Sequence, residues 1–212
     1  MAQGWKRLGR ARPWYALLVA GLLAVAGAPS GWAAAPQDRI REILAAVAAV
    51  LDDPRLQGPA HEGERTHQVQ QLIQDTFAFE VMAREALGAQ WPRLTPQQRE
   101  EFIPLFGALF THSYQRLVVK FLPGRQTSYG RESIEQDRAT VQTTLVVPQR
   151  QEQLTVDYRL IMQAQRWAVF DVVVDGVSLA GNYRAQFDKI LRTTSYEALV
   201  QQIRRKLGEE AS

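Results

Sequence analysis

The hydrophobic positions of this chain change their period near residue 125 and again near residue 180. Before residue 125, apolar residues recur three and four positions apart, which is the spacing of amphipathic helices. They then alternate with polar residues, as in half-buried strands, until the helical spacing returns. The pattern predicts an α+β fold, with a curved four-stranded antiparallel sheet packed against N-terminal and C-terminal helices.

Four helices are expected before the first change of period. They span residues 34–51, 61–77, 79–87 and 96–121. Gly88 is expected to end the third helix, because glycine accepts the backbone conformation found there. Thr95 and Gln98 have the spacing of a capping box at the start of the fourth. Large apolar residues cover a wide arc of that helix, so we expect it to be covered on more than one side.

The alternating region predicts a meander of four strands. They span residues 128–136, 140–147, 153–162 and 166–174, and the connections 148–151 and 163–166 are short enough for hairpins. Two helices at 180–191 and 194–207 complete the chain. Thr194 and Glu197 have capping-box spacing at the start of the last one.

The fourth strand reads as apolar on both faces. Under strict alternation one face carries Trp167, Val169, Asp171 and Val173, and the other carries Ala168, Phe170, Val172 and Val174. Asp175 and Gly176 then end the strand in a turn, since glycine accepts a positive φ. A strand of this kind has to be covered on both sides.

Residues 1–33 differ in composition from the rest. A basic segment is followed by an apolar run at 14–26, and Gly31 and Ala33 occupy the small-residue positions of a cleavage site. We predict a cleaved signal peptide at 1–33, a single domain at 34–208 and a tail at 209–212. An uncleaved anchor is the alternative, but the run is shorter than the roughly 20 apolar residues of a spanning helix.

Removing this segment changes the charge. The chain has 25 Lys and Arg against 22 Asp and Glu, and four of the basic residues lie in the predicted signal, which leaves 21 against 22 and a net charge of −1. The main argument for nucleic-acid binding is thereby lost. The absence of cysteine excludes disulfides, thiolate metal sites and cysteine nucleophiles. We expect an exported monomer, located in a bacterial periplasm or outside the cell.

Patterns typical of catalysis are scarce. The chain has no G-x-S-x-G, no H-E-x-x-H and no phosphate-binding glycine loop, and its three histidines lack metal-site spacing. Asp171 and Asp175 would lie about 13 Å apart at ~3.3 Å per strand residue, too far for a glycosidase pair. We therefore predict no catalytic residue and no metal site. Asp175 is expected to make the turn, and Asp171 to pair with a base such as Arg184.

The affirmative signal is a surplus of apolar side chains on the sheet and the long helix. Such a surplus is compatible with a solid core or with an elongated apolar cavity between the sheet and the helices. Periodicity leaves both open.

Two sequence blocks carry a family resemblance. WAVFDVVVDGVSLAGNYRAQFDKIL, with its Asp-Gly-Val-Ser turn and Asn-Tyr-Arg-x-x-Phe helix, resembles the closing motif of the MlaC (toluene-tolerance) family of periplasmic lipid-binding proteins. FAFEVMAREALGAQWPRLTPQQREEF resembles a second family block. The resemblance covers residues 39–207, and its one departure is the link at 193–196, where the family pattern has a glycine.

The resemblance implies a carrier that holds the acyl chains of a phospholipid in an apolar cavity and shuttles the lipid between outer and inner membranes. The implied partners are an outer-membrane lipoprotein complex and an inner-membrane ABC transporter with a periplasmic ring protein. The phospholipid is cargo, and no cofactor is implied.

This interpretation predicts two groups of residues, one that contacts the lipid and one with a structural role. The lipid-binding residues are expected among Phe106, Phe110, Tyr114, Leu117, Leu145, Val156, Tyr158, Trp167, Val169, Val172 and Val174. A structural role in bracing the strand-to-helix turn is expected for Asp175, Gly176, Tyr183, Arg184 and Phe187.

Three alternatives stay open at this point. A paralogue of the same fold would bind a hopanoid. An enzyme would need a carboxylate in the pocket, for which Asp171 is the candidate, and a periplasmic assembly factor would show an exposed apolar groove.

Overall fold

The computed structural model describes residues 34–147 and 152–210, which form six α-helices and a five-stranded antiparallel sheet. The elements are α1 (Pro36–Leu51), α2 (Glu62–Thr76), α3 (Phe79–Leu87), α4 (Pro96–Phe121), β1 (Gln126–Glu135), β2 (Arg138–Val147), β3 (Glu152–Gln163), β4 (Arg166–Val174), β5 (Val177–Ser178), α5 (Leu179–Leu191) and α6 (Tyr196–Glu210). Short 3-10 helices occur at Pro54–Leu56, Pro59–His61 and Gly88–Arg93. The predicted signal peptide, the 148–151 hairpin and residues 211–212 of the tail lie outside the described residues.

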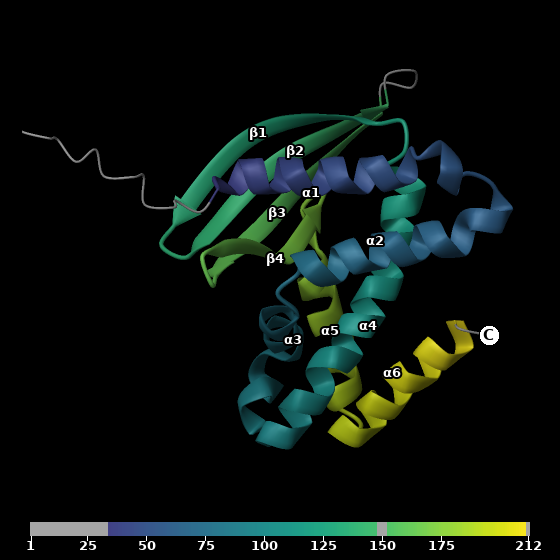
Figure 1. Cartoon of the computed structure of the whole chain (residues 1–212). Coiled ribbons are helices and arrows are strands. Elements are labelled where there is room, and N and C mark those ends of the chain that lie inside the picture. Colours follow the sequence, from purple (N-terminus) through teal and green to yellow (C-terminus); the bar gives the residue numbers. More distant parts are fainter. Residues whose placement is uncertain (1–33, 148–151, 211–212) are drawn as a thin grey trace, which may run out of the picture. The chain divides into compact units, whose positions relative to one another are not determined.

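The strands follow one another in the order β1-β2-β3-β4-β5. Figure 1 shows α1 lying across one face of the curved sheet, with α2 beside it. We call the face covered by α1 the inner face. Helix α2 contacts α1 and α4, whereas α4 continues away from the sheet to contact α3 and α6. None of the helices in the described ranges combines the length and hydropathy needed to cross a membrane.

Side-chain caps fix where two of the helices begin. The predicted capping box of α4 is present, because the backbone N–H of Gln98 donates to Thr95 Oγ1 at 3.2 Å and the backbone N–H of Thr95 donates to Gln98 Oε1 at 3.0 Å. The cap of α6 is shifted by one residue from the prediction. Ser195 Oγ accepts the Ala198 N–H at 3.3 Å, while the Thr194 hydroxyl donates to the Ile190 carbonyl of the preceding helix.

The prediction of four strands misses β5. Asp175 and Gly176 have φ values of 46° and 82°, and positive φ at both central residues is what a type I′ hairpin turn requires. The turn brings Val177 back to pair with Val174. The sequence places Val177 and Ser178 in the connection before the helix expected at 180–191, because a two-residue strand is too short to show any alternation.

Strict alternation along β4 is also wrong. Arg159 of β3 pairs with Asp171, and the next residue, Leu160, pairs with Val169. Phe170 is therefore an extra residue without a partner on β3, which is a β-bulge.

The bulge reverses the facing of every residue after it. Val172 and Val174 pair with Tyr158 and Val156, which lie on the inner face. The two valines consequently share that face with Val169, from which strict alternation would separate them. The apparent second apolar face of β4 is largely a continuation of the first.

Asp171, on the outer face, joins β4 to the start of α5. Its side chain is only 3% exposed. Oδ1 accepts the Ala180 N–H at 3.0 Å, and Oδ2 accepts the Ser178 hydroxyl at 2.6 Å and Arg159 Nη1 at 3.1 Å. Ser178 Oγ in turn accepts the Gly181 N–H at 2.8 Å, so the Asp-Gly-Val-Ser motif caps the helix.

Asp171 pairs with a base, as predicted, but that base is Arg159 on the neighbouring strand and not Arg184. Arg184 instead lies against Gly88, where a Cβ would come within 2.6 Å of Arg184 Nε. Gly88 also has a positive φ of 49° and follows the last residue of α3, as predicted. A guanidinium at a helix C-terminus is favourably placed relative to the helix dipole.

We expect Asp171→Ala to lower the free energy of unfolding by about 2–4 kcal/mol, because it leaves a buried amide N–H and a hydroxyl without an acceptor. The measurement is urea denaturation. Arg159→Ala is the control, since its side chain is 48% exposed and its ion pair should contribute less than about 1 kcal/mol. Equal losses in the two variants would show that the ion pair, rather than the cap, is responsible for the stability.

Candidate ligand-binding site

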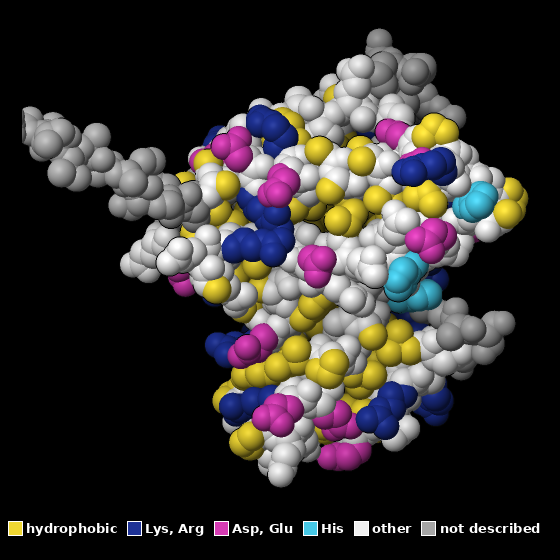
Figure 2. Space-filling model, in the orientation of Figure 1, with side chains coloured by type: hydrophobic (Ala, Val, Ile, Leu, Met, Phe, Trp, Pro, Cys, Tyr) yellow, Lys and Arg dark blue, Asp and Glu magenta, His cyan; other side chains and the backbone are white. Residues whose placement is uncertain are grey.

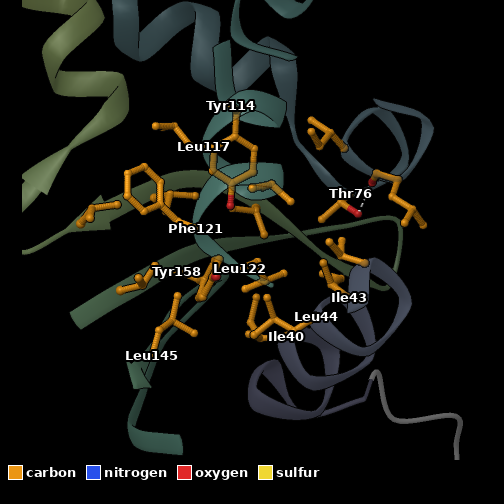
Figure 3. Close-up of a pocket in the computed structure, with 18 of the residues that line it drawn as sticks. Ile40, Ile43, Leu44, Thr76, Tyr114, Leu117, Phe121, Leu122, Leu145 and Tyr158 are labelled. Carbon is orange, nitrogen blue, oxygen red and sulfur yellow. Dashed lines mark hydrogen bonds between the residues drawn. The ribbon is translucent and has the colours of Figure 1, made fainter. Parts of the chain in front are cut away.

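An apolar pocket lies between the inner face of the sheet and helices α1, α2 and α4, with a cavity volume of about 180 Å³. Figure 3 shows side chains from these elements converging on it, with Ile40, Ile43 and Leu44 contributed by α1 and Tyr114 and Leu117 by α4. On the face drawn in Figure 2, hydrophobic side chains are visible between α1 and α2.

The structure brings most of the sequence-predicted lipid-binding residues together around this pocket. The members that line it are Tyr114, Leu117, Leu145, Val156, Tyr158, Val169, Val172 and Val174. They come from α4 and from three adjacent strands. Val172 and Val174 belong to this group only because the bulge turns them inward.

Phe106, Phe110 and Trp167 do not line the pocket. The Phe106 ring packs edge-on against Tyr183, with centroids 5.3 Å apart, and also contacts Phe187. Phe110 packs behind the wall, against Tyr114 at 5.2 Å. Trp167 lies at the far end of β4, beside the start of α1. Tyr183 and Phe187, expected to brace the turn, thus belong to an aromatic cluster between α4 and α5.

The length of α4 explains why its apolar arc is so wide. At 1.5 Å per residue a helix of 26 residues is about 39 Å long. Its first half packs among α3, α5 and α6, where Phe102 and Phe106 are fully buried. Its last two turns line the pocket. The wide apolar arc of α4 therefore has two separate neighbours, the helices around its first half and the pocket at its end.

Much of the lining was not predicted. The additional residues are Ile40, Ile43, Leu44, Val47, Leu72, Ile73, Thr76, Phe77, Val118, Phe121, Leu122 and Leu154. The helical spacing of α1 and α2 predicts a buried face, but it does not indicate whether that face meets core or cavity. Phe77 is held here because the next residue, Ala78, donates its N–H to the Val169 carbonyl at 2.8 Å and ties the chain after α2 to β4.

The lining is almost entirely hydrocarbon. Among the described lining residues, only Thr76, Tyr114 and Tyr158 have a polar side-chain atom, and none is charged. The Thr76 hydroxyl donates to the Leu72 carbonyl, so it is already satisfied. Figure 3 shows the hydroxyl of Tyr114 pointing toward Tyr158.

Burial raises the pKa of Tyr114 to about 12. Burial also raises the pKa of Tyr158 well above its usual value, and the neighbouring Tyr114 phenol adds to that effect. Both groups are therefore neutral hydrogen-bonding groups at physiological pH. They can contact an ester or hydroxyl oxygen of a ligand but do not supply a base.

The pocket does not contain the carboxylate that an enzyme would need. Asp171 lies on the opposite face of the sheet, with its oxygens already bound to three donors. No group of three or more His, Asp or Glu suited to a metal ion occurs in the part of the chain that the structure describes. The arrangement suits the binding of an apolar ligand.

The size of the cavity limits what it holds in this conformation. A dry engineered cavity of about 150 Å³ accepts one benzene molecule. The pocket seen here is only slightly larger, so it accommodates a segment of an acyl chain. A ligand with two long hydrocarbon chains exceeds this volume.

Comparison with known proteins identifies the family. A family model described as MlaC protein matches residues 41–205. The chain belongs to the MlaC family. The match includes both sequence blocks on which the resemblance was based, so that interpretation is confirmed.

One solved structure similar to this MlaC-family chain is a phospholipid-binding protein from Ralstonia solanacearum in complex with a phospholipid. The TM-score is 0.70 and the sequence identity 22%, and the alignment covers 84% of this chain and 100% of that one. At this identity the likeness shows a shared fold. No curated protein matches the chain.

The presence of free space in the pocket can be tested without a ligand. Val174 is half-buried and faces the cavity, so we expect Val174→Phe to leave the free energy of unfolding unchanged or raise it by up to about 1 kcal/mol. Val141 is fully buried outside the lining, and Val141→Phe should cost about 1–3 kcal/mol through overpacking. Equal losses for both variants in urea denaturation would contradict the presence of free space beside Val174.

The raised pKa of Tyr114 predicts a loss of stability at alkaline pH. The phenol ionises near pH 10 in the unfolded chain and near 12 in the fold, so the free energy of unfolding is unaffected below about pH 10 and falls above it. We expect Tyr114→Phe to remove about 2 kcal/mol of this fall by pH 12, as measured from urea midpoints. Parallel pH profiles for the two proteins would contradict the assignment.

Proposed function

We propose that this MlaC-family protein is a periplasmic lipid carrier. It holds the acyl chains of a phospholipid in the pocket and shuttles the lipid between outer and inner membranes as the soluble component of an ABC transport system. The observation that carries this proposal is the uncharged hydrocarbon pocket between α1, α2, α4 and the sheet.

The energetics of lipid transfer favour a pocket of this kind. Two acyl chains contain some thirty methylenes, and exposing them to water costs about 25 kcal/mol at ~0.8 kcal/mol each. A carrier has to offer a lining close to hydrocarbon, so that exchange with a bilayer is nearly neutral. A lining with three hydroxyl groups and no charge meets that condition.

The comparisons support the same class of function. The family membership and the phospholipid-binding neighbour from Ralstonia solanacearum favour a binding or transport protein over an enzyme. We infer from the family that residues 1–33 direct export and are removed, leaving a single domain. The partners on this proposal are an outer-membrane lipoprotein complex and an inner-membrane ABC transporter with a periplasmic ring protein.

Native mass spectrometry of the protein purified from cells without detergent, followed by lipid extraction, tests the proposal. We expect a stoichiometric phospholipid in the wild-type protein. A hopanoid in its place would replace the proposed cargo, and the absence of any lipid would contradict the carrier function.

Two variants test whether the lipid binds in the pocket. Leu145→Asp places a carboxylate in the lining, and Val174→Phe fills part of the cavity; both should lower the lipid content at least about tenfold, because a charge in hydrocarbon is strongly unfavourable and a filled cavity excludes the chain. Thr144→Asp, next to Leu145 but on the outer face, and Ile134→Phe, on exposed β1, are the matched controls. Unchanged lipid content in the pocket variants would show that the ligand binds elsewhere.

A further inference from the structure

The pocket opens to solvent at the end of α4. Leu117 and Phe121 are 40% and 37% exposed, more than any other large apolar side chain of the described lining. Figure 3 places Phe121 at one side of the ring of lining residues and Thr76 at the opposite side. We call the region around Leu117 and Phe121 the mouth.

Two cations converge on the mouth. Lys120 Nζ lies 5.1 Å from the centroid of the Phe121 ring, and Arg125 Cζ lies 5.8 Å from the same centroid. The distance between Lys120 Nζ and Arg125 Cζ therefore cannot exceed the sum of these two distances. Neither forms an ion pair with a carboxylate in the described part of the chain.

The surrounding sequence has no compensating acid. Between Glu101 and Glu132 the chain contains no Asp or Glu, although it contains four Lys and Arg. A lysine in the last turn of a helix is ordinarily explained by the helix dipole. That explanation does not extend to Arg125, which lies beyond the end of α4 and points back to the same ring.

We propose that Lys120 and Arg125 form a subsite for the phosphate of the bound lipid. The inference rests on the proposed function and specifies how the lipid is oriented. Acyl chains that fill the hydrocarbon lining leave the glycerol phosphate where the pocket meets water. Phe121 lines the pocket at that point, and both cations lie against its ring.

The chemistry of the two side chains suits a phosphate. The planar guanidinium of Arg125 offers paired N–H donors to two phosphate oxygens, and the ammonium of Lys120 offers three donors around a point charge. Both keep their contact with Phe121, since a cation above an aromatic face remains free to donate outward. The contact is to the phosphate common to glycerophospholipids, so it does not discriminate among their headgroups.

Calorimetric titration of delipidated protein with monomeric short-chain lipids tests the subsite. Dihexanoyl-phosphatidylglycerol and dihexanoylglycerol have the same tails, and only the first carries a phosphate. We expect the wild-type protein to bind the phosphate-bearing lipid about tenfold more tightly, with the preference falling as salt is added. Lys120→Gln combined with Arg125→Gln should reduce the preference to about twofold or less while leaving the affinity for dihexanoylglycerol unchanged.

Lys189→Gln combined with Arg192→Gln is the control, because it removes the same charge from exposed positions at the end of α5. It should retain the preference. Equal binding of the two lipids by the wild-type protein would overturn the subsite but leave the carrier function intact, whereas binding of neither lipid would contradict the function itself. A preference seen only with phosphatidylglycerol vesicles would place the cations against a bilayer surface and likewise overturn the subsite.

Discussion

The β-bulge at Phe170 determines what each face of the sheet does. Without the extra residue, Val172 and Val174 would face outward and Asp171 would point into hydrocarbon. With it, the valines complete the pocket wall and the carboxylate reaches the first turn of α5. A one-residue irregularity thus places an apolar wall and a polar cap on opposite sides of the same short strand. The proposed binding site and the anchoring of the C-terminal helices both depend on it.

Helix α4 connects two environments that have little in common. Its first half lies in a close-packed aromatic cluster with α5, where Phe102 and Phe106 have no solvent exposure. Its last two turns face a cavity and then solvent. The same helix therefore provides rigid packing at one end and, on the proposed function, ligand contacts at the other.

Features that depend on a few adjacent residues could be predicted from the sequence. The capping box at Thr95 and the C-cap at Gly88 were predicted because each depends on a few adjacent residues. The bulge, β5 and the lining from α1 were not, because they depend on strand register and on which helix faces which part of the sheet. Eight of the eleven predicted lining residues meet at one pocket, but Phe106 and Trp167 have the same apolar character and lie elsewhere. Apolar periodicity identifies a buried face without identifying its neighbour.

The small volume of the pocket has a consequence for a carrier of the proposed kind. A wide cavity left open after release would present hydrocarbon to every other protein in its compartment and would invite aggregation. A pocket of about 180 Å³ exposes little of that surface. On the proposed function, a lipid with two chains needs more space than this, so part of its binding free energy goes into widening the pocket, and that cost favours its release.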